Sequence, residues 1–151
     1  METEAKNLVV NFWSQDRGFI FFKISIGESI FESRFSDVFD PIPHLRAWLE
    51  SITTGVEQCS FSYATEGEDP TFNYHSRYGN SPDVFFEGEN EYNEKTRGVY
   101  ARVDRHQFVN AFYTTFLDFL SSETFINTDW DAEMRSSFKS KIIEEYLAEM
   151  K

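Results

Sequence analysis

The chain has 151 residues, a formal net charge of −12 and a single cysteine. This acidity opposes binding to nucleic acid or to anionic membranes, because contacts with phosphate groups require Lys and Arg side chains. One cysteine cannot form an internal disulfide, and METEAKNLVV lacks the basic and apolar regions of a secretory signal, so we expect a cytoplasmic protein. No apolar run approaches the roughly 18–20 residues that cross a bilayer.

The N-terminal third predicts three strands, at residues 8–13, 19–26 and 29–35. The second segment is apolar at nearly every position, which favours a central strand covered on both faces, with a buried helix segment as the alternative. Gly27 and Glu28 form a tight hairpin turn between the second and third segments. A first sheet is therefore expected before any helix.

A helix follows, since Asp40 supplies an N-terminal cap, Pro41 a proline at the first helical position, and Gly55 a stop. Its apolar stripe consists of Leu45, Trp48, Leu49 and Ile52. The apolar period then changes to two, which predicts strands near residues 59–64, 72–77, 84–87 and 99–103.

The strongest helix signal lies at residues 103–122, where an aromatic face follows a cap at Asp104. A last helix is predicted over residues 129–150. Strands followed by helices indicate the α+β class, with a mainly antiparallel sheet of about six to seven strands packed against about three helices, two of them C-terminal. We expect one domain over residues 1–151, with an aromatic-rich core because 17 residues are Phe.

Catalytic and metal motifs are absent from the sequence. The histidines His44, His75 and His106 are widely separated, and Cys59 has no cysteine partner, so zinc-type spacing does not occur. Cys59 falls on the inward face of a predicted strand, which favours a structural thiol over a nucleophile. We therefore predict a non-enzymatic protein with no cofactor and no metal; an unorthodox small hydrolase is the alternative, and a deep pocket holding a carboxylate of strongly raised pKa would favour it.

Acidic residues gather in two loops. The loop at residues 66–70 and the segment EGENEYNE supply the candidate partner-binding residues, which are Glu66, Glu68, Asp69, Glu87, Glu89, Glu91, Tyr92 and Glu94. One interpretation is an acidic surface, with Tyr92 as its anchor, for a protein with a basic surface. The alternatives are a calcium or acid–base site, although the spacing of an EF-hand is missing, and a solvated loop.

One predicted strand carries Asn73, His75 and Arg77 on the same face. If this face is open it could bind a small ligand or stack a base, but the net acidity disfavours nucleic acid. The alternative is an ordinary polar sheet face.

Two segments resemble a known type of protein. DPIPHLRAWLESITTG and RVDRHQFVNAFYTTFLDFL are similar to segments of small bacterial proteins found among the immunity proteins that accompany polymorphic toxins, and Trp130 matches a later Trp of these proteins. The resemblance implies an immunity protein that neutralises a cognate toxin by direct binding, and it brings no catalytic residues. The alternative is a structural or regulatory module that binds a host protein or itself. The sequence leaves the oligomeric state open.

Overall fold

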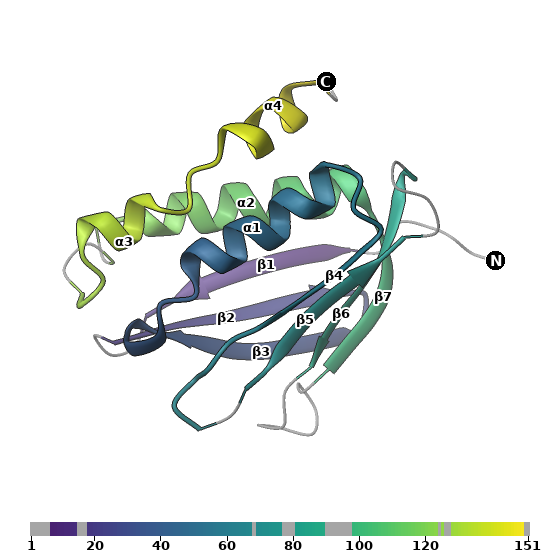
Figure 1. Ribbon diagram of the computed structural model, residues 1–151. Coiled ribbons are helices and arrows are strands. Elements are labelled where there is room, and N and C mark those ends of the chain that lie inside the picture. Colours follow the sequence, from purple (N-terminus) through teal and green to yellow (C-terminus); the bar gives the residue numbers. More distant parts are fainter. Residues whose placement is uncertain are drawn as a thin grey trace.

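The computed structural model describes residues 7–14, 18–67, 69–76, 81–89, 98–123, 125 and 128–149. Within these ranges the chain forms seven strands, four α-helices and one short 3-10 helix (Figure 1). The strands are β1 (Leu8–Trp13), β2 (Phe19–Ile26), β3 (Ser29–Ser36), β4 (Gln58–Ser62), β5 (Thr71–His75), β6 (Asp83–Glu89) and β7 (Gly98–Asp104). The helices are η1 (Asp37–Phe39), α1 (Ile42–Thr53), α2 (Arg105–Leu120), α3 (Ala132–Ser136) and α4 (Lys141–Glu149). The α+β class predicted from the sequence is confirmed.

The first three strands form an antiparallel sheet in the order β1-β2-β3. Gly27 has a positive φ of 60° in the turn between β2 and β3, a conformation that favours glycine. β2 is the central strand, as predicted, but the expectation that both its faces are covered is wrong. Its residues alternate between buried and half-buried, so that Phe19, Phe21 and Lys23 lie on a partly open outer face.

The other four strands form a second antiparallel sheet in the order β4-β5-β6-β7. The two sheets meet along β3 and β7, and beside this junction Phe31 of β3 packs on Gly88 of β6. A Cβ atom on Gly88 would lie 3.0 Å from the Phe31 ring, so glycine permits this close approach. The predicted strands therefore divide between two sheets that share one core.

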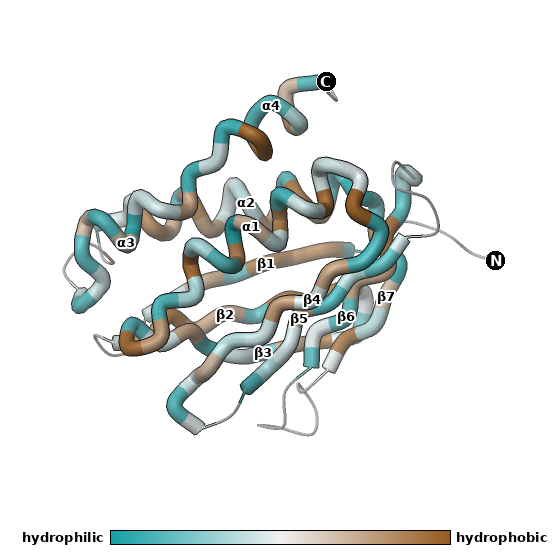
Figure 2. The backbone as a smooth tube through the Cα atoms, viewed as in Figure 1, coloured by the Kyte–Doolittle hydropathy of each residue, from teal (hydrophilic) through white to brown (hydrophobic). Residues whose placement is uncertain are grey.

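The helices α1 and α2 lie side by side over the inner faces of the sheets, with α3 beside one end of them and α4 above them in the view of Figure 1. Hydrophobic and hydrophilic residues alternate along α1, α2 and the strands β4–β7, as expected for elements with one buried face (Figure 2). Phe72 is fully buried at the centre, with ring contacts to Phe22, Trp48, Phe86 and Phe112. The Phe-rich composition thus serves one aromatic core.

The predicted cap at Asp104 is present, whereas α1 begins one residue later than predicted, at Ile42, with Pro41 as its N-cap and Asp40 before it. The Asp40 carboxylate accepts a hydrogen bond from the Ile42 amide at 3.0 Å, and burial raises its pKa. The Asp104 carboxylate accepts one from the Gln107 amide at 2.8 Å, which fixes the start of α2.

The predicted last helix, at residues 129–150, is wrong as a continuous element. The chain leaves the helical path after α3, and the Ser140 hydroxyl caps a new helix by accepting a hydrogen bond from the Ile143 amide at 3.1 Å. Local capping by serine therefore interrupts an apolar pattern that continues in the sequence.

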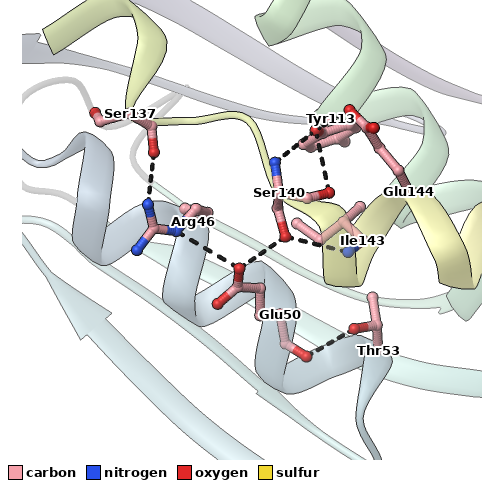
Figure 3. Close-up of polar contacts among 8 residues, drawn as sticks. All are labelled: Arg46, Glu50, Thr53, Tyr113, Ser137, Ser140, Ile143 and Glu144. Atoms are coloured by element: carbon pink, nitrogen blue, oxygen red, sulfur yellow. Dashed lines mark hydrogen bonds and ion pairs between the residues drawn. The ribbon is translucent and has the colours of Figure 1, made fainter. Parts of the chain in front are cut away.

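A polar network fixes this break to the helices beneath it (Figure 3). The Tyr113 hydroxyl donates to the Glu144 carboxylate at 2.7 Å and accepts from the Ser140 amide at 2.9 Å. Glu50 accepts from the Ser140 hydroxyl at 2.7 Å, and Arg46 donates to the Ser137 carbonyl at 2.7 Å. The C-terminal segment is thereby tied to both α1 and α2.

Burial is the main cause that raises the pKa of Tyr113 to about 12, and the neighbouring Glu144 carboxylate adds to it. The pKa of Glu144 is lowered, first by its hydrogen bond from Lys139 and then by the one from Tyr113. Each residue is therefore held in the protonation state that the network needs, a neutral phenol beside a carboxylate.

Candidate protein-interaction face

The outer face of the four-stranded sheet points away from α1 and α2 (Figure 1). Side chains alternate along each strand, so that one set enters the core and the other forms this outer face. The register places the outward residues in cross-strand rows. One row runs Gln58–His75–Phe85–Arg102, and the next runs Ser60–Asn73–Glu87–Tyr100.

An aromatic cluster lies on this face, formed by His75, Phe85 and Tyr100. The ring centroids of His75 and Phe85 are 5.0 Å apart with an interplanar angle of 15°, and those of Phe85 and Tyr100 are 5.9 Å apart at 14°. The His75 Nε2 atom lies 3.3 Å from the Tyr100 hydroxyl. Tyr100 is 58% exposed, although an aromatic side chain of this size is mostly buried when it serves only the core.

A polar row leads up to the aromatic cluster. The Ser60 hydroxyl donates to Asn73 Oδ1 at 2.9 Å, which turns the Asn73 amide nitrogen toward Glu87. Asn73 Nδ2 then donates to Glu87 Oε1 at 3.5 Å. The row ends at Tyr100, the direct cross-strand partner of Glu87. A carboxylate therefore stands next to the most exposed aromatic ring of the face.

The candidate residues from the sequence are partly brought together by the fold. Glu87 and Glu89 both lie on the outer face of β6, and Asp69 is exposed before β5. Because Thr71 pairs with Glu89, the loop before β5 and the end of β6 lie at one end of the sheet. Acidic residues from both predicted loops thus meet at that end.

Glu66 has a different environment, because its carboxylate accepts a short hydrogen bond from the buried Ser36 hydroxyl at the end of β3. The remaining candidates, Glu68, Glu91, Tyr92 and Glu94, lie outside the described residues, as does Arg77.

Sequence reasoning missed Phe85 and Tyr100. The signal for them was available, since Phe85 alternates with the inward Val84 and Phe86, and Tyr100 alternates with Val99 and Ala101. What the sequence could not supply was the register that brings Phe85 and Tyr100 against His75.

A second aromatic surface lies on the outer face of the three-stranded sheet. Trp13 and Phe21 stack with centroids 6.0 Å apart, and the Arg34 guanidinium lies 4.5 Å from the centroid of the Phe19 ring. A hollow of about 80 Å³ adjoins them, and it is lined by Trp13, Phe21, Phe22, Glu32, Ser33, Arg34 and Thr65. The Arg34 guanidinium and the Glu32 carboxylate both line this hollow, so the surface has no dominant charge.

The other side chains that could bind a metal or act in catalysis are dispersed over the part of the chain that the structure describes. Among the residues that the structure describes, no three His, Cys, Asp or Glu side chains gather as a metal site would require. Cys59 is half-buried, and Asp40, the carboxylate with a raised pKa, accepts a hydrogen bond from the first residue of α1. In that same part of the chain, no helix combines the length and apolarity needed to cross a membrane.

Comparison of the chain with protein-family models, with curated proteins and with solved structures gives no match.

Proposed function

We propose that the protein is a non-enzymatic binding protein, an immunity protein of the cytoplasm that neutralises a cognate bacterial toxin by direct contact. The observation that carries the proposal is the outer face of the four-stranded sheet, where a stacked aromatic cluster of the exposed Tyr100 and the half-buried His75 and Phe85 adjoins Glu87 and Glu89. Interfaces of this kind combine aromatic anchors with a polar rim.

Charge supports the same proposal. A net charge of −12 accelerates the approach of a basic partner through long-range attraction, and it repels phosphate-bearing partners. The resemblance of residues 40–55 and 102–120 to immunity proteins is consistent with this class. These segments form α1, α2 and the end of β7, so the resemblance concerns mainly the scaffold behind the face.

The test uses the neighbouring gene in the source genome, expressed in bacteria with and without this protein. We expect the neighbour alone to stop growth and co-expression to restore it, with a stable complex recovered by size-exclusion chromatography. A harmless neighbour that forms no complex would remove the immunity proposal.

The surface is tested by charge reversal. Glu87→Lys and Glu89→Lys should slow association with the toxin at low salt by about tenfold or more, because rim charges act mainly on the association rate. The matched control is Glu145→Lys in α4, which changes the net charge equally on an exposed helix. Equal slowing by all three variants would mean that net charge, and not this face, guides the toxin.

Self-association, or binding to a host protein, is the second candidate function. It is favoured by Val38 and Phe39, adjacent residues of η1 that are 65% and 50% exposed. Neighbouring exposed apolar residues form the kind of patch that marks an interface. Sedimentation of the wild type and of a Val38→Asp/Phe39→Asp variant decides this: a dimer that the variant abolishes supports it, and a monomeric wild type excludes self-association at that patch.

A further inference from the structure

We infer that the outer face of the four-stranded sheet contains a site for one arginine side chain of the partner, between Glu87 and the ring of Tyr100. The inference rests on the proposed function, since it names the chemistry by which that same face would recognise its partner.

The first argument is the position of the Glu87 carboxylate. Within the described residues, this carboxylate accepts a hydrogen bond from Asn73 Nδ2 at 3.5 Å, which is longer than a normal hydrogen bond. Glu87 is half-buried on the sheet, with Asn73 on one side and Tyr100 on the other. A half-buried carboxylate in this position gains most from a donor that reaches it over the ring.

The second argument is the ring of Tyr100. Directly opposed residues of antiparallel strands have their Cβ atoms about 4.5–5.5 Å apart, so a planar cation lying on the Tyr100 ring is within reach of Glu87. The rings of Phe85 and His75 stack with the Tyr100 ring, at centroid distances of 5.9 Å and 6.2 Å, and limit its movement. Because its movement is already restricted, the Tyr100 side chain loses little conformational entropy when a ligand binds to it.

The third argument is the choice of arginine over lysine. A guanidinium stacks flat on an aromatic ring and donates two parallel hydrogen bonds to a carboxylate, whereas an ammonium offers only a compact charge. The protein shows this stacking elsewhere, where the Arg34 guanidinium lies 4.5 Å from the centre of the Phe19 ring. Negative charge at Glu87 and Glu89 opposes a phosphate or a carboxylate as the ligand.

The experiment is a ¹⁵N NMR titration with three blocked tripeptides, Gly-Arg-Gly, Gly-Lys-Gly and Gly-citrulline-Gly. Citrulline has the shape of arginine without its charge. We expect the arginine peptide to shift the amide signals of Glu87 and Tyr100, and to bind at least about threefold more tightly than the lysine peptide because of stacking. The citrulline peptide should bind more weakly than both.

Two variants separate the site from general attraction. Glu87→Gln should weaken the arginine peptide by about fivefold or more, because it removes a charge-assisted hydrogen bond, while Glu89→Gln removes the same charge farther from the ring and should change binding by less than about twofold. Tyr100→Ser should abolish the preference for arginine over lysine. The same spectra show whether each variant is folded.

Equal weakening by Glu87→Gln and Glu89→Gln would overturn the inference, as would signal shifts that avoid β6 and β7 or equal affinity for arginine and lysine. These outcomes are independent of the toxin experiment. Restored growth without arginine preference would refute only this site, and arginine binding without any toxin complex would refute only the immunity proposal.

Discussion

The two faces of the four-stranded sheet use similar residues for opposite purposes. Phe85 and Phe86 are neighbours on β6, yet Phe86 is fully buried against Trp48 and Phe108, whereas Phe85 stacks with His75 and Tyr100 on the outer face. The difference is the parity of the position along the strand, because successive side chains point to opposite faces. Composition alone therefore does not separate core aromatics from surface aromatics.

The largest expected effect tests that difference directly. Phe86→Ala should lower the free energy of unfolding by about 3–5 kcal/mol, since it leaves a cavity in the core. Phe85→Ala, one residue away, should cost less than about 1 kcal/mol, because its ring has only surface contacts. Urea unfolding followed by circular dichroism measures both values. Equal losses would show that the outer face is also part of the folding core.

The same comparison applies to two arginines. Arg105 is 5% exposed and donates to the carbonyl oxygens of Ile52 and Ser81, both at 2.7 Å. Arg102, on the outer face, has an ion pair to Asp83 at 3.6 Å with both side chains substantially exposed.

Arg105→Met should cost about 2–3 kcal/mol, because two carbonyl groups lose their donors inside the protein. Arg102→Met should cost about 0.5 kcal/mol or less, as expected for an exposed ion pair. Thermal unfolding of both variants measures the contrast. If Arg105→Met lowered the free energy of unfolding no more than Arg102→Met does, water molecules would have to replace the guanidinium as hydrogen-bond donors to both carbonyl groups.

The fold could be predicted because its signals are local. These signals are the alternation of residues 58–62 and 71–75, the hydrogen bonds that Asp40 and Asp104 accept at the starts of α1 and α2, and the aromatic face of α2. Each depends on neighbours within one turn or one strand. The division into two sheets could not be predicted, because it depends on contacts such as Phe31 on Gly88 between distant segments. The break near Ser140 depends likewise on Glu50 and Tyr113 of other helices.

The candidate face could be predicted only in part. Glu87, Glu89 and His75 were singled out from the sequence, whereas Tyr100 was not, although it is the most exposed ring of the face. Its importance arises from the register of β6 against β7, which sets it opposite Glu87. The register of β6 against β7 is determined by the turn between these strands and by the packing of the core. The few residues around Tyr100 do not determine either of these.

A smaller effect concerns two tyrosines. Tyr113→Phe should cost about 1–2 kcal/mol at neutral pH, because the Ser140 amide and the Glu144 carboxylate both lose a partner. Tyr100→Phe removes a hydroxyl on the exposed face, where water replaces its partner, so its effect should be close to zero.

The pH dependence of Tyr113 has a definite sign. Its pKa rises from 10 in the unfolded chain to about 12 in the folded protein, so the unfolded chain releases this proton first as the pH rises. The associated stability is complete below pH 10 and is lost between pH 10 and about 12. The stability difference between wild type and Tyr113→Phe should therefore shrink over that range in urea unfolding, and a constant difference would contradict the buried, neutral phenol.

The smallest effect separates two acidic candidates at the same end of the sheet. Glu66→Ala should cost about 1 kcal/mol, because the buried Ser36 hydroxyl loses its acceptor, whereas Glu89→Ala, at an exposed position, should leave stability unchanged. Glu66 has a φ of 69°, a conformation that strains glutamate and alanine alike. Backbone strain therefore does not contribute to the stability difference between the wild type and Glu66→Ala. Glu66→Gly should recover about 1 kcal/mol relative to Glu66→Ala by relieving that strain.

For association with a basic partner the order should reverse, with Glu89→Ala slowing association more than Glu66→Ala, because the Glu66 carboxylate is already bound to Ser36. Stopped-flow measurement of the association rates at low salt gives this order. A greater slowing by Glu66→Ala than by Glu89→Ala would indicate that the partner binds nearer to the three-stranded sheet.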